Sequence, residues 1–379
     1  VQLSNGSTYP IFIKKISASA MAHKVWVDRR RNLMYGRNEA RFYKEFANLL
    51  KARNVSLPDV AKIDITMDEV VGNSQLPDPP GEEPSLEILN RSGSLMLLSC
   101  VGNEHTQASP LSSTQLLAAL ETVGRLHAAA WGDDALLNNV AMRLHRVGGS
   151  YSLSSRNPKE LENIPENWTK FVAAFKEASP ELFRKESVIN LGRRLQLIAP
   201  LVARELIAQP SQPQATLIHG DLKAMNIFIP KAENPQTAGI LIDFASTGVG
   251  YCMSDVAMLL IHSVAPEDLL GEKEGNVIRS YLEILHSARS KAGLPRIKYS
   301  FDDAMWHYRL ATVDYARFMV GRFWGKASPS EFEKKASSKN TTLINRNINA
   351  ALSFIARLDK CLNFLEKKLR SQTNTSAAS

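Results

Sequence analysis

The chain has 379 residues, of which 44% are hydrophobic and 22% charged, as is typical of a soluble globular protein long enough for two domains or one two-lobed unit. The apolar run 95–101 is too short to cross a bilayer, and residues 1–10 lack the basic and then apolar layout of a secretory signal. Three isolated cysteines without metal-site spacing suit a reducing compartment: Cys100, Cys252 and Cys361. We therefore expect a cytoplasmic protein with no membrane partner.

The net charge of +8 favours an anionic partner. Its basic residues are scattered over segments that lie far apart in the chain, such as 24–31, 143–149 and 364–370, and none of these segments contains a recognised nucleic-acid motif. We interpret each segment as a solvated face and expect no nucleic-acid partner. A mildly basic surface would also attract an anionic small molecule such as a nucleotide.

The first hundred residues predict a small sheet with one helix. Apolar positions at helical spacing predict the helix over 34–53, and prolines with charged residues mark 72–85 as an exposed loop. Runs of strand-forming residues predict the strands, the first two of which would form a hairpin: 1–3, 9–16, 59–67 and 94–101.

Beyond residue 102 the pattern becomes mainly helical. The segment 112–132 begins with Ser and Thr capping residues and ends at Gly132. The exceptions are the strand-like stretches around 217–230 and 239–246, and the polar tail 371–379, which we expect to be disordered. The other predicted helices are 168–178, 190–208, 254–263, 274–292, 301–324 and 344–370.

The stretch "LIHGDLKAMNIFIP" places polar residues on a loop between strand-like segments. An acceptor hydroxyl needs a carboxylate to orient it and take its proton, which suits Asp221. Magnesium prefers oxygen ligands, which the Asn226 amide and the Asp243 carboxylate would supply. Lys223 could reach the transferred phosphate. Alone, His219 would be interpreted as a core histidine, but His-x-Asp with Asn five residues after the Asp, then a hairpin ending in Asp-Phe, matches the kinase catalytic pattern.

Four segments carry a family resemblance. "HGDLKAMN" resembles the catalytic loop of the aminoglycoside phosphotransferase and choline kinase-like superfamily. "RLHAAAW" (125–131) and "RNEARFYKEF" (37–46) are similar to its ecdysteroid kinase-like branch, and "SDVAMLL" resembles the segment whose acid, here Asp255, braces the catalytic loop. The resemblance runs in order from about residue 9 to 365.

The resemblance implies an α+β, two-lobed protein kinase-like fold with ATP and Mg²⁺ in the cleft. The lobes would be a partial N-lobe over 1–101 and a C-lobe over 102–370. Lys14, two residues after an inward Phe12, would contact the phosphates and pair with Glu39, while Lys15 points to the opposite face. The hinge that meets adenine would be Ser99, Cys100 and Val101.

The chain departs from the family pattern in three places. The branch usually has an acidic hinge residue where this chain has Ser99 and Cys100, and Asp-Phe-Gly is here Asp-Phe-Ala. The glycine-rich loop and first strand are not found ahead of the strand that holds Lys14, because Gly6 falls in a later turn. This last departure suggests an incomplete or processed sequence, and it keeps open the alternative of a pseudokinase, a nucleotide-binding scaffold without turnover.

Substrate preference should come from the C-lobe. Segment 302–324 mixes aromatic and basic residues and offers Asp314 among three arginines, which disfavours a polycationic aminoglycoside and favours a neutral or anionic apolar alcohol. Packing of these aromatics in the core explains many of them, and an aromatic cage for a choline-type substrate stays open.

Two further classes of protein are less consistent with the sequence. The last helix carries a heptad-like apolar seam that could organise an interaction protein, but it covers only about two heptads, so we expect packing onto its own lobe and a monomer. A protein kinase is disfavoured because no Ala-Pro-Glu segment follows Asp243. We predict an ATP- and Mg²⁺-dependent small-molecule kinase acting on a hydroxyl group. The seam consists of Ile355, Leu358, Leu362, Leu365 and Leu369.

Overall fold

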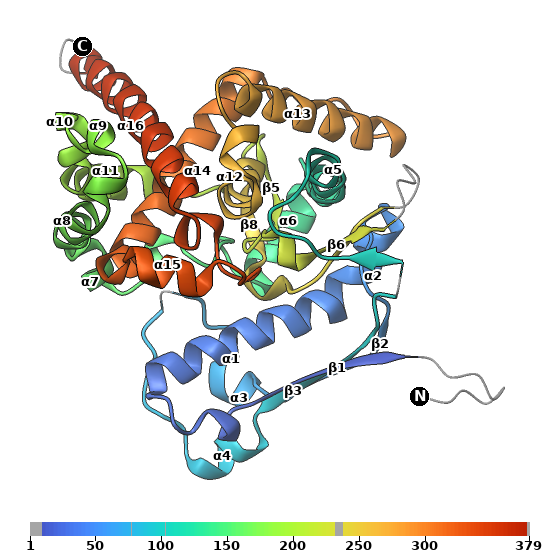
Figure 1. The fold of residues 1–379 in the computed structure, drawn as a ribbon. Coiled ribbons are helices and arrows are strands. Elements are labelled where there is room, and N and C mark those ends of the chain that lie inside the picture. The colour runs from blue at the N-terminus through green and yellow to red at the C-terminus, as the bar shows by residue number, and fades with distance from the viewer. Residues whose placement is uncertain (1–9, 77, 103, 232–237, 377–379) are drawn as a thin grey trace.

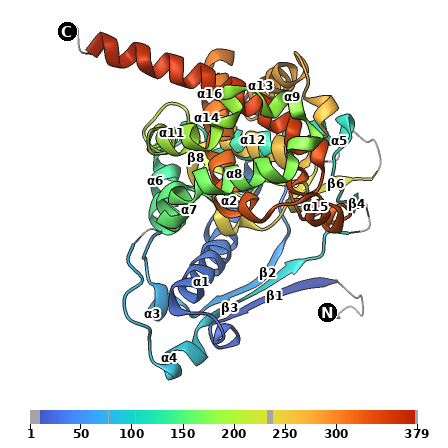
Figure 2. The same ribbon diagram turned by 60° about the vertical axis from the view of Figure 1, so that its left-hand side comes forward.

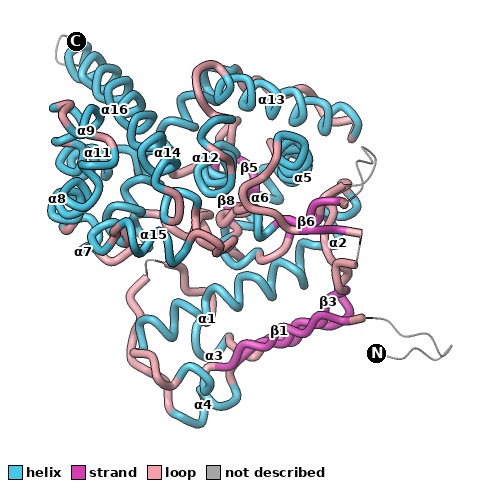
Figure 3. Tube along the Cα trace, in the orientation of Figure 1, coloured by secondary structure: helices cyan, strands magenta, loops and turns pink. Residues whose placement is uncertain are grey.

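The computed structural model describes residues 10–76, 78–102, 104–231 and 238–376, with side chains up to Lys368. A small sheet-containing lobe is followed by a larger helical lobe (Figure 1). The longest strands lie in the smaller lobe, and helices dominate the larger one (Figure 3). The predicted α+β, two-lobed kinase-like fold class is thereby confirmed.

The N-lobe sheet is antiparallel, with strand order β1-β3-β2 among the described residues. These strands are β1 (Ile11–Ser17), β2 (Val60–Ile65) and β3 (Gly93–Ser99). Lys14 pairs with the buried Met96, so it lies on the face that the first helix covers, and Lys15 lies on the other.

Two expectations for this sheet need comment. Phe12 shares the face of Lys14, but the expectation that it points inward was wrong, because its side chain is 51% exposed on a strand that forms the sheet edge within the described chain. The predicted strand 1–3 and its turn lie outside the described residues.

The predicted helix 34–53 is interrupted and starts earlier. It comprises α1 (Trp26–Arg41), a π-helical turn η2 (Phe42–Phe46) and α2 (Ala47–Ala52). The interpretation of 24–31 as a solvated face was wrong for Arg29 and Arg30, which are buried. Their guanidinium groups donate to backbone carbonyls, Arg29 to Ala22 at 2.9 Å and Arg30 to Asp78 at 3.1 Å, and this backbone pairing allows the helix to begin at Trp26.

The segment after β2 contains α3 (Asp68–Val71) and α4 (Leu86–Arg91), with a mostly exposed loop between them as predicted. Gln75 is the exception within that loop, because it is buried. Its amide donates to the Leu144 carbonyl at 2.7 Å and accepts from the Arg146 N–H at 3.1 Å. The loop of the smaller lobe is thereby attached to the backbone of the larger one.

The strands of the C-lobe are short and lie around the stretch quoted above. Strand β5 (Ala215–Ile218) pairs with β8 (Gly248–Tyr251), whereas β6 (Ile227–Pro230) pairs with β4 (His105–Thr106) and β7 (Ile240–Leu241). The strands that flank residues 219–226 therefore belong to different sheets.

The remaining elements are helical and match most predicted spans within a few residues. The helix after the hinge begins with a capping box formed by Ser112 and Gln115. The helices are α5 (Ser113–Ala130), α6 (Asp134–Arg143), α7 (Pro158–Glu162), α8 (Ile164–Phe175), α9 (Pro180–Phe183), α10 (Glu186–Ile189), α11 (Leu191–Glu205), α12 (Cys252–Ser263), α13 (Lys273–Lys291), α14 (Phe301–Arg322), α15 (Pro329–Lys335) and α16 (Ile348–Ser376).

The last helix packs as expected along its first part. Ile355, Leu358, Leu362 and Leu365 are buried in the apolar cluster that includes residues of α8, α11 and α14. The expectation of disorder from residue 371 was wrong as far as Ser376, since α16 continues to that residue and its end projects from the lobe (Figure 2). Extending an existing helix costs far less than nucleating one, so polar residues can continue it.

The described part of the chain contains no helix that is both long and apolar enough to cross a membrane.

Acidification should destabilise the protein through His145, which lies fully buried beside Tyr35 with its ring centroid 5.4 Å away. Burial lowers the pKa of His145 from 6.5 to about 4, an effect that Arg37 reinforces. Because folding lowers this pKa, the stabilisation is complete above pH 6.5 and is lost as the pH falls through 4. The shift corresponds to about 3 kcal/mol of unfolding free energy.

Urea unfolding across this pH interval checks the expectation. His145→Gln keeps a donor for the Ala245 carbonyl, which the histidine Nε2 approaches at 3.0 Å, but has no ionisable ring. The variant should therefore lose less stability on acidification than the unmodified chain. Parallel profiles for the two proteins would contradict the role of His145.

Candidate active site

The loop after β5 is fixed by the buried ring of His219. Its Nδ1 accepts from the Asp221 N–H at 3.3 Å, so Nε2 carries the proton and donates to the Ile242 carbonyl at 2.8 Å. Gly220 has a φ of +80°, and a Cβ there would overlap the Ser246 carbonyl. The ring therefore joins the loop that carries Asp221 to the residue just before Asp243.

Asp255, on α12, binds two backbone N–H groups of the same loop. Its carboxylate accepts from the His219 N–H at 2.7 Å and from the Gly220 N–H at 2.9 Å, and His127 Nε2 lies 3.0 Å away. Burial acts to raise the pKa of Asp255, but the hydrogen bond and charge of His127 and the Gly220 N–H keep it below 3.8. The bracing role that the resemblance implied for Asp255 is confirmed by these contacts.

Asp221, on the same loop, is surrounded by hydrogen-bond donors. Its carboxylate accepts from Lys223 Nζ at 3.1 Å and from Asn226 Nδ2 at 3.2 Å, and Ser150 Oγ lies 3.4 Å away. Asn226 also donates to the Asp221 carbonyl at 2.8 Å, and η5 (Ala224–Asn226) positions it there. The structure thus brings the predicted Asp221, Lys223 and Asn226 together in one hydrogen-bonded group.

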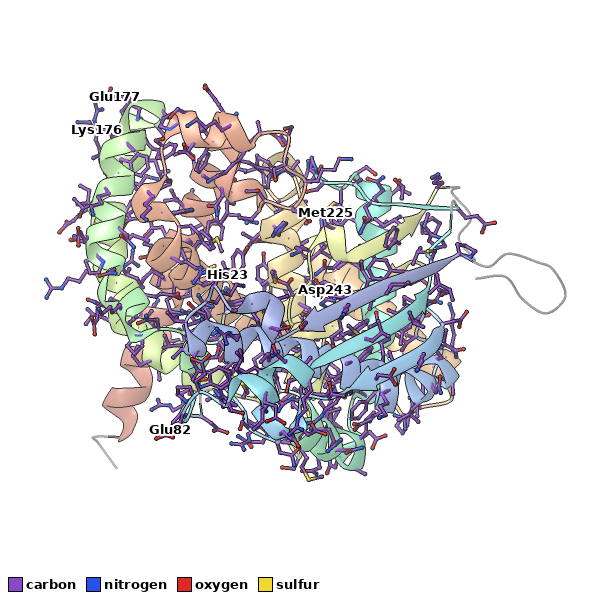
Figure 4. The ribbon with its side chains drawn as sticks, turned by 90° about the horizontal axis from the view of Figure 1, so that it is seen from below. His23, Glu82, Lys176, Glu177, Met225 and Asp243 are labelled. Carbon is purple, nitrogen blue, oxygen red and sulfur yellow. The ribbon has the colours of Figure 1, made fainter. Side chains whose placement is uncertain are left out.

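Asp243 faces the N-lobe from a left-handed backbone conformation, with φ 66°. Its carboxylate is 37% exposed and lies 3.4 Å from Lys14 Nζ, which also contacts Glu39 at 2.6 Å. Burial raises the pKa of Glu39 to about 7, although Lys14 opposes the shift. In Figure 4, Asp243 lies where the N-lobe sheet meets the larger lobe, with Met225 on the far side of that junction.

The first helix locks the segment after Asp243. The buried Asn38 amide donates to the carbonyls of Phe244, Ala245 and Thr247 at 3.2, 3.0 and 3.0 Å. The ring of Phe244, in η6 (Phe244–Ser246), stacks on Phe42 with centroids 3.7 Å apart. Helix α1 therefore positions Glu39 and the residues next to Asp243 together.

Comparison with known proteins assigns a family to this arrangement. The sequence model of the phosphotransferase enzyme family matches residues 24–289, a span that contains Glu39, Asp221, Asn226 and Asp243. The chain belongs to this family. A search of curated proteins returned no match. The finer assignment to an ecdysteroid kinase-like branch stays a prediction.

Solved structures similar to this phosphotransferase are distant from it. A microcompartment-associated aminopropanol kinase is 14% identical, with 97% of this chain and 88% of the other covered and a TM-score of 0.40. The choline kinase LicA from Streptococcus pneumoniae is 12% identical, with coverages of 92% and 87% and a TM-score of 0.38. An amicoumacin kinase is 12% identical, with coverages of 95% and 82% and a TM-score of 0.40. These similarities are too weak to inform the site of the phosphotransferase.

The donor set of the phosphotransferase suits a hard divalent cation. Asn226 uses its Nδ2 on Asp221, so its Oδ1 stays available as a neutral oxygen ligand. The Asp243 carboxylate is partly exposed and has Lys14 as its recorded side-chain contact. The described residues contain no group of three or more His, Cys, Asp or Glu side chains that could hold a metal ion together. Asn226 and Asp243 are the side chains that could hold such a cation.

The structure reduces the number of predicted hinge residues whose backbone N–H group could meet adenine. The Ser99 N–H donates to the Asp59 carbonyl at 2.8 Å, and the Cys100 N–H donates to the Pro10 carbonyl at 3.3 Å. The Ser99 and Cys100 amides are thus already engaged within the N-lobe. Of the three predicted hinge residues, Val101 is the one whose N–H has no recorded backbone partner in the described chain.

A cavity of about 1050 Å³ lies elsewhere, among residues of α5, α13 and the turn after α2. It is lined by Arg53, Trp131, Asp133 and Arg289, among others, and by none of the predicted site residues. The site assignment therefore depends on the contacts of Asp221 and Asp243.

Sequence reasoning missed the positioning residues Asn38 and Ser150. Asn38 contacts carbonyls more than 200 positions away, and Ser150 lies 71 positions from Asp221. His127 lies in the segment 125–131 that carries part of the family resemblance, and its partners Asp255 and Tyr281 emerge from the fold.

Replacing Asn38 tests how strongly α1 holds this segment. Asn38→Ala leaves the carbonyls of Phe244, Ala245 and Thr247 without that donor, and we expect a loss of about 2–3 kcal/mol of unfolding free energy. Chemical denaturation measures it. Asn138→Ala is the control, because that exposed amide donates to the Asp134 carbonyl in its own helix. Equal, small losses in both variants would show that Asn38 does not anchor the segment.

Proposed function

We propose that the protein transfers the γ-phosphate of Mg·ATP to a hydroxyl group of a small molecule. The observation that carries the proposal is the presence of two hydrogen-bonded groups, one around Asp221 and one around Asp243. Asp221 is held by Lys223 and Asn226, and Asp243 lies 3.4 Å from a lysine that is itself paired with Glu39. Membership of the phosphotransferase enzyme family supports this reading.

The proposed roles follow from the contacts. Asp221 orients the acceptor hydroxyl and takes its proton as the new P–O bond forms and the bond from the γ-phosphorus to the leaving ADP oxygen breaks. Lys223, 3.1 Å from Asp221, contacts the transferred phosphate. Lys14, oriented by Glu39, contacts the other phosphates of the nucleotide.

The remaining groups hold the nucleotide and the metal. The cation supplies charge neutralisation of the phosphates when bound to Asn226 and Asp243. Val101 is the hinge residue proposed to meet adenine through its backbone.

Asp221→Asn tests the base. The amide cannot accept the proton, so phosphate transfer should fall by roughly 10²–10⁴-fold. Mg·ATP binding should change little, because Asp221 is not a proposed ligand of nucleotide or metal. Coupled ADP release with a panel of alcohols measures transfer, and calorimetry measures binding. Asp302→Asn, at an exposed position of α14, is the control. Near-normal transfer by Asp221→Asn would refute the assignment.

Asp243→Ala tests the proposed role of Asp243 as a ligand of the metal ion. Removing this carboxylate should abolish the heat of Mg·ATP binding, and chelation of Mg²⁺ should have the same effect on the unmodified chain. Unchanged binding in the variant would place the cation elsewhere. Strong binding without transfer to any alcohol would instead favour the pseudokinase alternative, a nucleotide-binding scaffold without turnover.

A further inference from the structure

Arg31, Arg156 and Arg322, here called the arginine cluster, gather around Tyr35. Burial raises the pKa of the Tyr35 hydroxyl, which the charges of Arg156, Arg31 and Arg322 lower and that of Asp221 raises. All of these charges therefore act on one tyrosine. Positions 31, 156 and 322 lie on α1, on the segment before α7 and at the end of α14.

A short segment connects the cluster to the catalytic loop. The Ser150 N–H donates to the Gly220 carbonyl at 3.0 Å, and its hydroxyl lies 3.4 Å from the Asp221 carboxylate. Six positions later the same segment reaches Arg156. Tyr35 of α1 and Gly149, Ser152 and Ser155 of this segment line one small cavity. Tyr35 and the segment that contacts Asp221 thus lie side by side, and the charges of the arginine cluster act on this tyrosine.

Glu160 organises two members of the cluster. Its carboxylate accepts from Arg156 Nε at 2.9 Å and Nη2 at 2.6 Å, and from Arg322 Nη1 at 3.0 Å. The Arg156 guanidinium also lies 5.0 Å from the ring centroid of Phe318, and that of Arg322 lies 5.6 Å from the ring centroid of Phe323. The arrangement combines oriented positive charge with apolar ring surface.

The cluster keeps donors that the protein does not use. Arg31 Nε is buried and has no hydrogen-bond partner among the described residues, and its ion-pair contact is the mostly exposed Asp28 at 3.7 Å. Arg322 is 46% exposed and contributes Nη1 to Glu160. The cluster therefore has spare donors, and the charges of Glu160 and Asp28 do not balance those of its three arginines. A buried donor without a partner is costly, so an acceptor oxygen from a ligand would relieve it.

We propose that the arginine cluster receives an oxyanion group of the acceptor, so that the favoured substrates are hydroxy compounds bearing a carboxylate, phosphate or sulfate group. Guanidinium groups suit such oxyanions because their donors match two oxygens at once. Phe318 and Phe323 would contact the apolar part of the acceptor. The inference rests on the proposed function, since it assigns the acceptor side of the same site.

Matched alcohols of different charge test the proposal. Mandelate, mandelamide and 2-amino-1-phenylethanol share a phenyl ring and a secondary hydroxyl but are anionic, neutral and cationic. Calorimetry with the full chain, with and without Mg·AMP-PNP, should give mandelate at least a tenfold affinity advantage over mandelamide. Inorganic sulfate is a second probe, because it presents the oxyanion without a carbon skeleton and should compete with mandelate.

Substitutions in the arginine cluster show whether it causes the preference for mandelate. Arg31→Gln and Arg322→Gln should each reduce the preference for mandelate about tenfold, which corresponds to 1.4 kcal/mol, and should weaken sulfate competition. Arg184→Gln is the control, because its exposed side chain pairs with Glu181 on the surface of α9. Equal affinities for the three alcohols, a preference for the cation, no binding of mandelate or sulfate, or unchanged preference in both arginine variants would each overturn the proposal.

The two levels of the hypothesis can fail separately. Phosphate transfer that depends on Asp221 but shows no preference for anionic acceptors would leave the proposed function standing and remove the oxyanion site. A preference for mandelate that the arginine variants lose, in a protein that transfers no phosphate, would support the oxyanion site and remove the proposed turnover.

Discussion

The loop that carries His219, Gly220 and Asp221 depends on one buried carboxylate. Asp255 has almost no exposed surface, and an ionised group in such a position is tolerable only when donors surround it. The backbone N–H groups of His219 and Gly220 and the ring of His127 supply those donors, and by doing so they fix the path of the loop. With that path fixed, the His219 ring reaches the Ile242 carbonyl, and the residue after Ile242 is Asp243. The separation of Asp221 and Asp243 thus follows from a residue that belongs to neither segment.

The first helix extends the same constraint to the smaller lobe. Phe42 and Phe46 belong to the apolar cluster that contains Leu126, Phe244 and Val256, so α1 and η2 share the core of the larger lobe. Polar contacts also attach this part of the smaller lobe to the larger lobe. Arg143 pairs with Glu45 through two hydrogen bonds of 2.8 and 2.7 Å, and its carbonyl accepts from Arg41 at 3.1 Å. Because the helix is attached to the larger lobe in this way, the Lys14–Glu39 pair is already assembled beside Asp243.

The parts of this site that could be predicted are those encoded within a few positions. The spacing of His219, Asp221 and Asn226 is local, and the apolar periodicity of α5 is sustained over several turns, so both were recoverable from the sequence. Arg29 and Arg30 were misread because a buried arginine that donates to backbone carbonyls looks, in sequence, like any surface arginine. Asn38 was missed for a related reason, since its carbonyl partners are more than 200 positions away and main-chain carbonyls leave no mark on residue type.

The aromatic residues of the segment 302–324 also show how little the sequence reveals about burial. Tyr308, Tyr315 and Trp324 are almost completely buried, so these members of the mixed run 302–324 serve the core. Arg317 is also buried and donates to Asp314 at 2.6 Å, which removes both from the surface charge balance. What remains accessible at the end of α14 is Arg322 and Phe323. Only the fold distinguishes these from their neighbours, because burial is a property of helix face and packing partner.

Electrostatics gives the arginine cluster a physical reason beyond its contacts. An anionic acceptor that approaches the nucleotide phosphates is repelled, by about 2 kcal/mol for two unit charges roughly 8 Å apart near a protein surface. In the proposed reaction Asp221 adds a further negative charge beside the acceptor hydroxyl, and Lys223 lies 3.1 Å from it. A positive cluster on the acceptor side would offset the repulsion while leaving the Asp221 carboxylate free to take a proton. The reverse charge pattern would be required for a cationic acceptor, which the phosphates already attract and which needs carboxylates to orient it. The positive charges of the arginine cluster therefore favour the anionic class of acceptor.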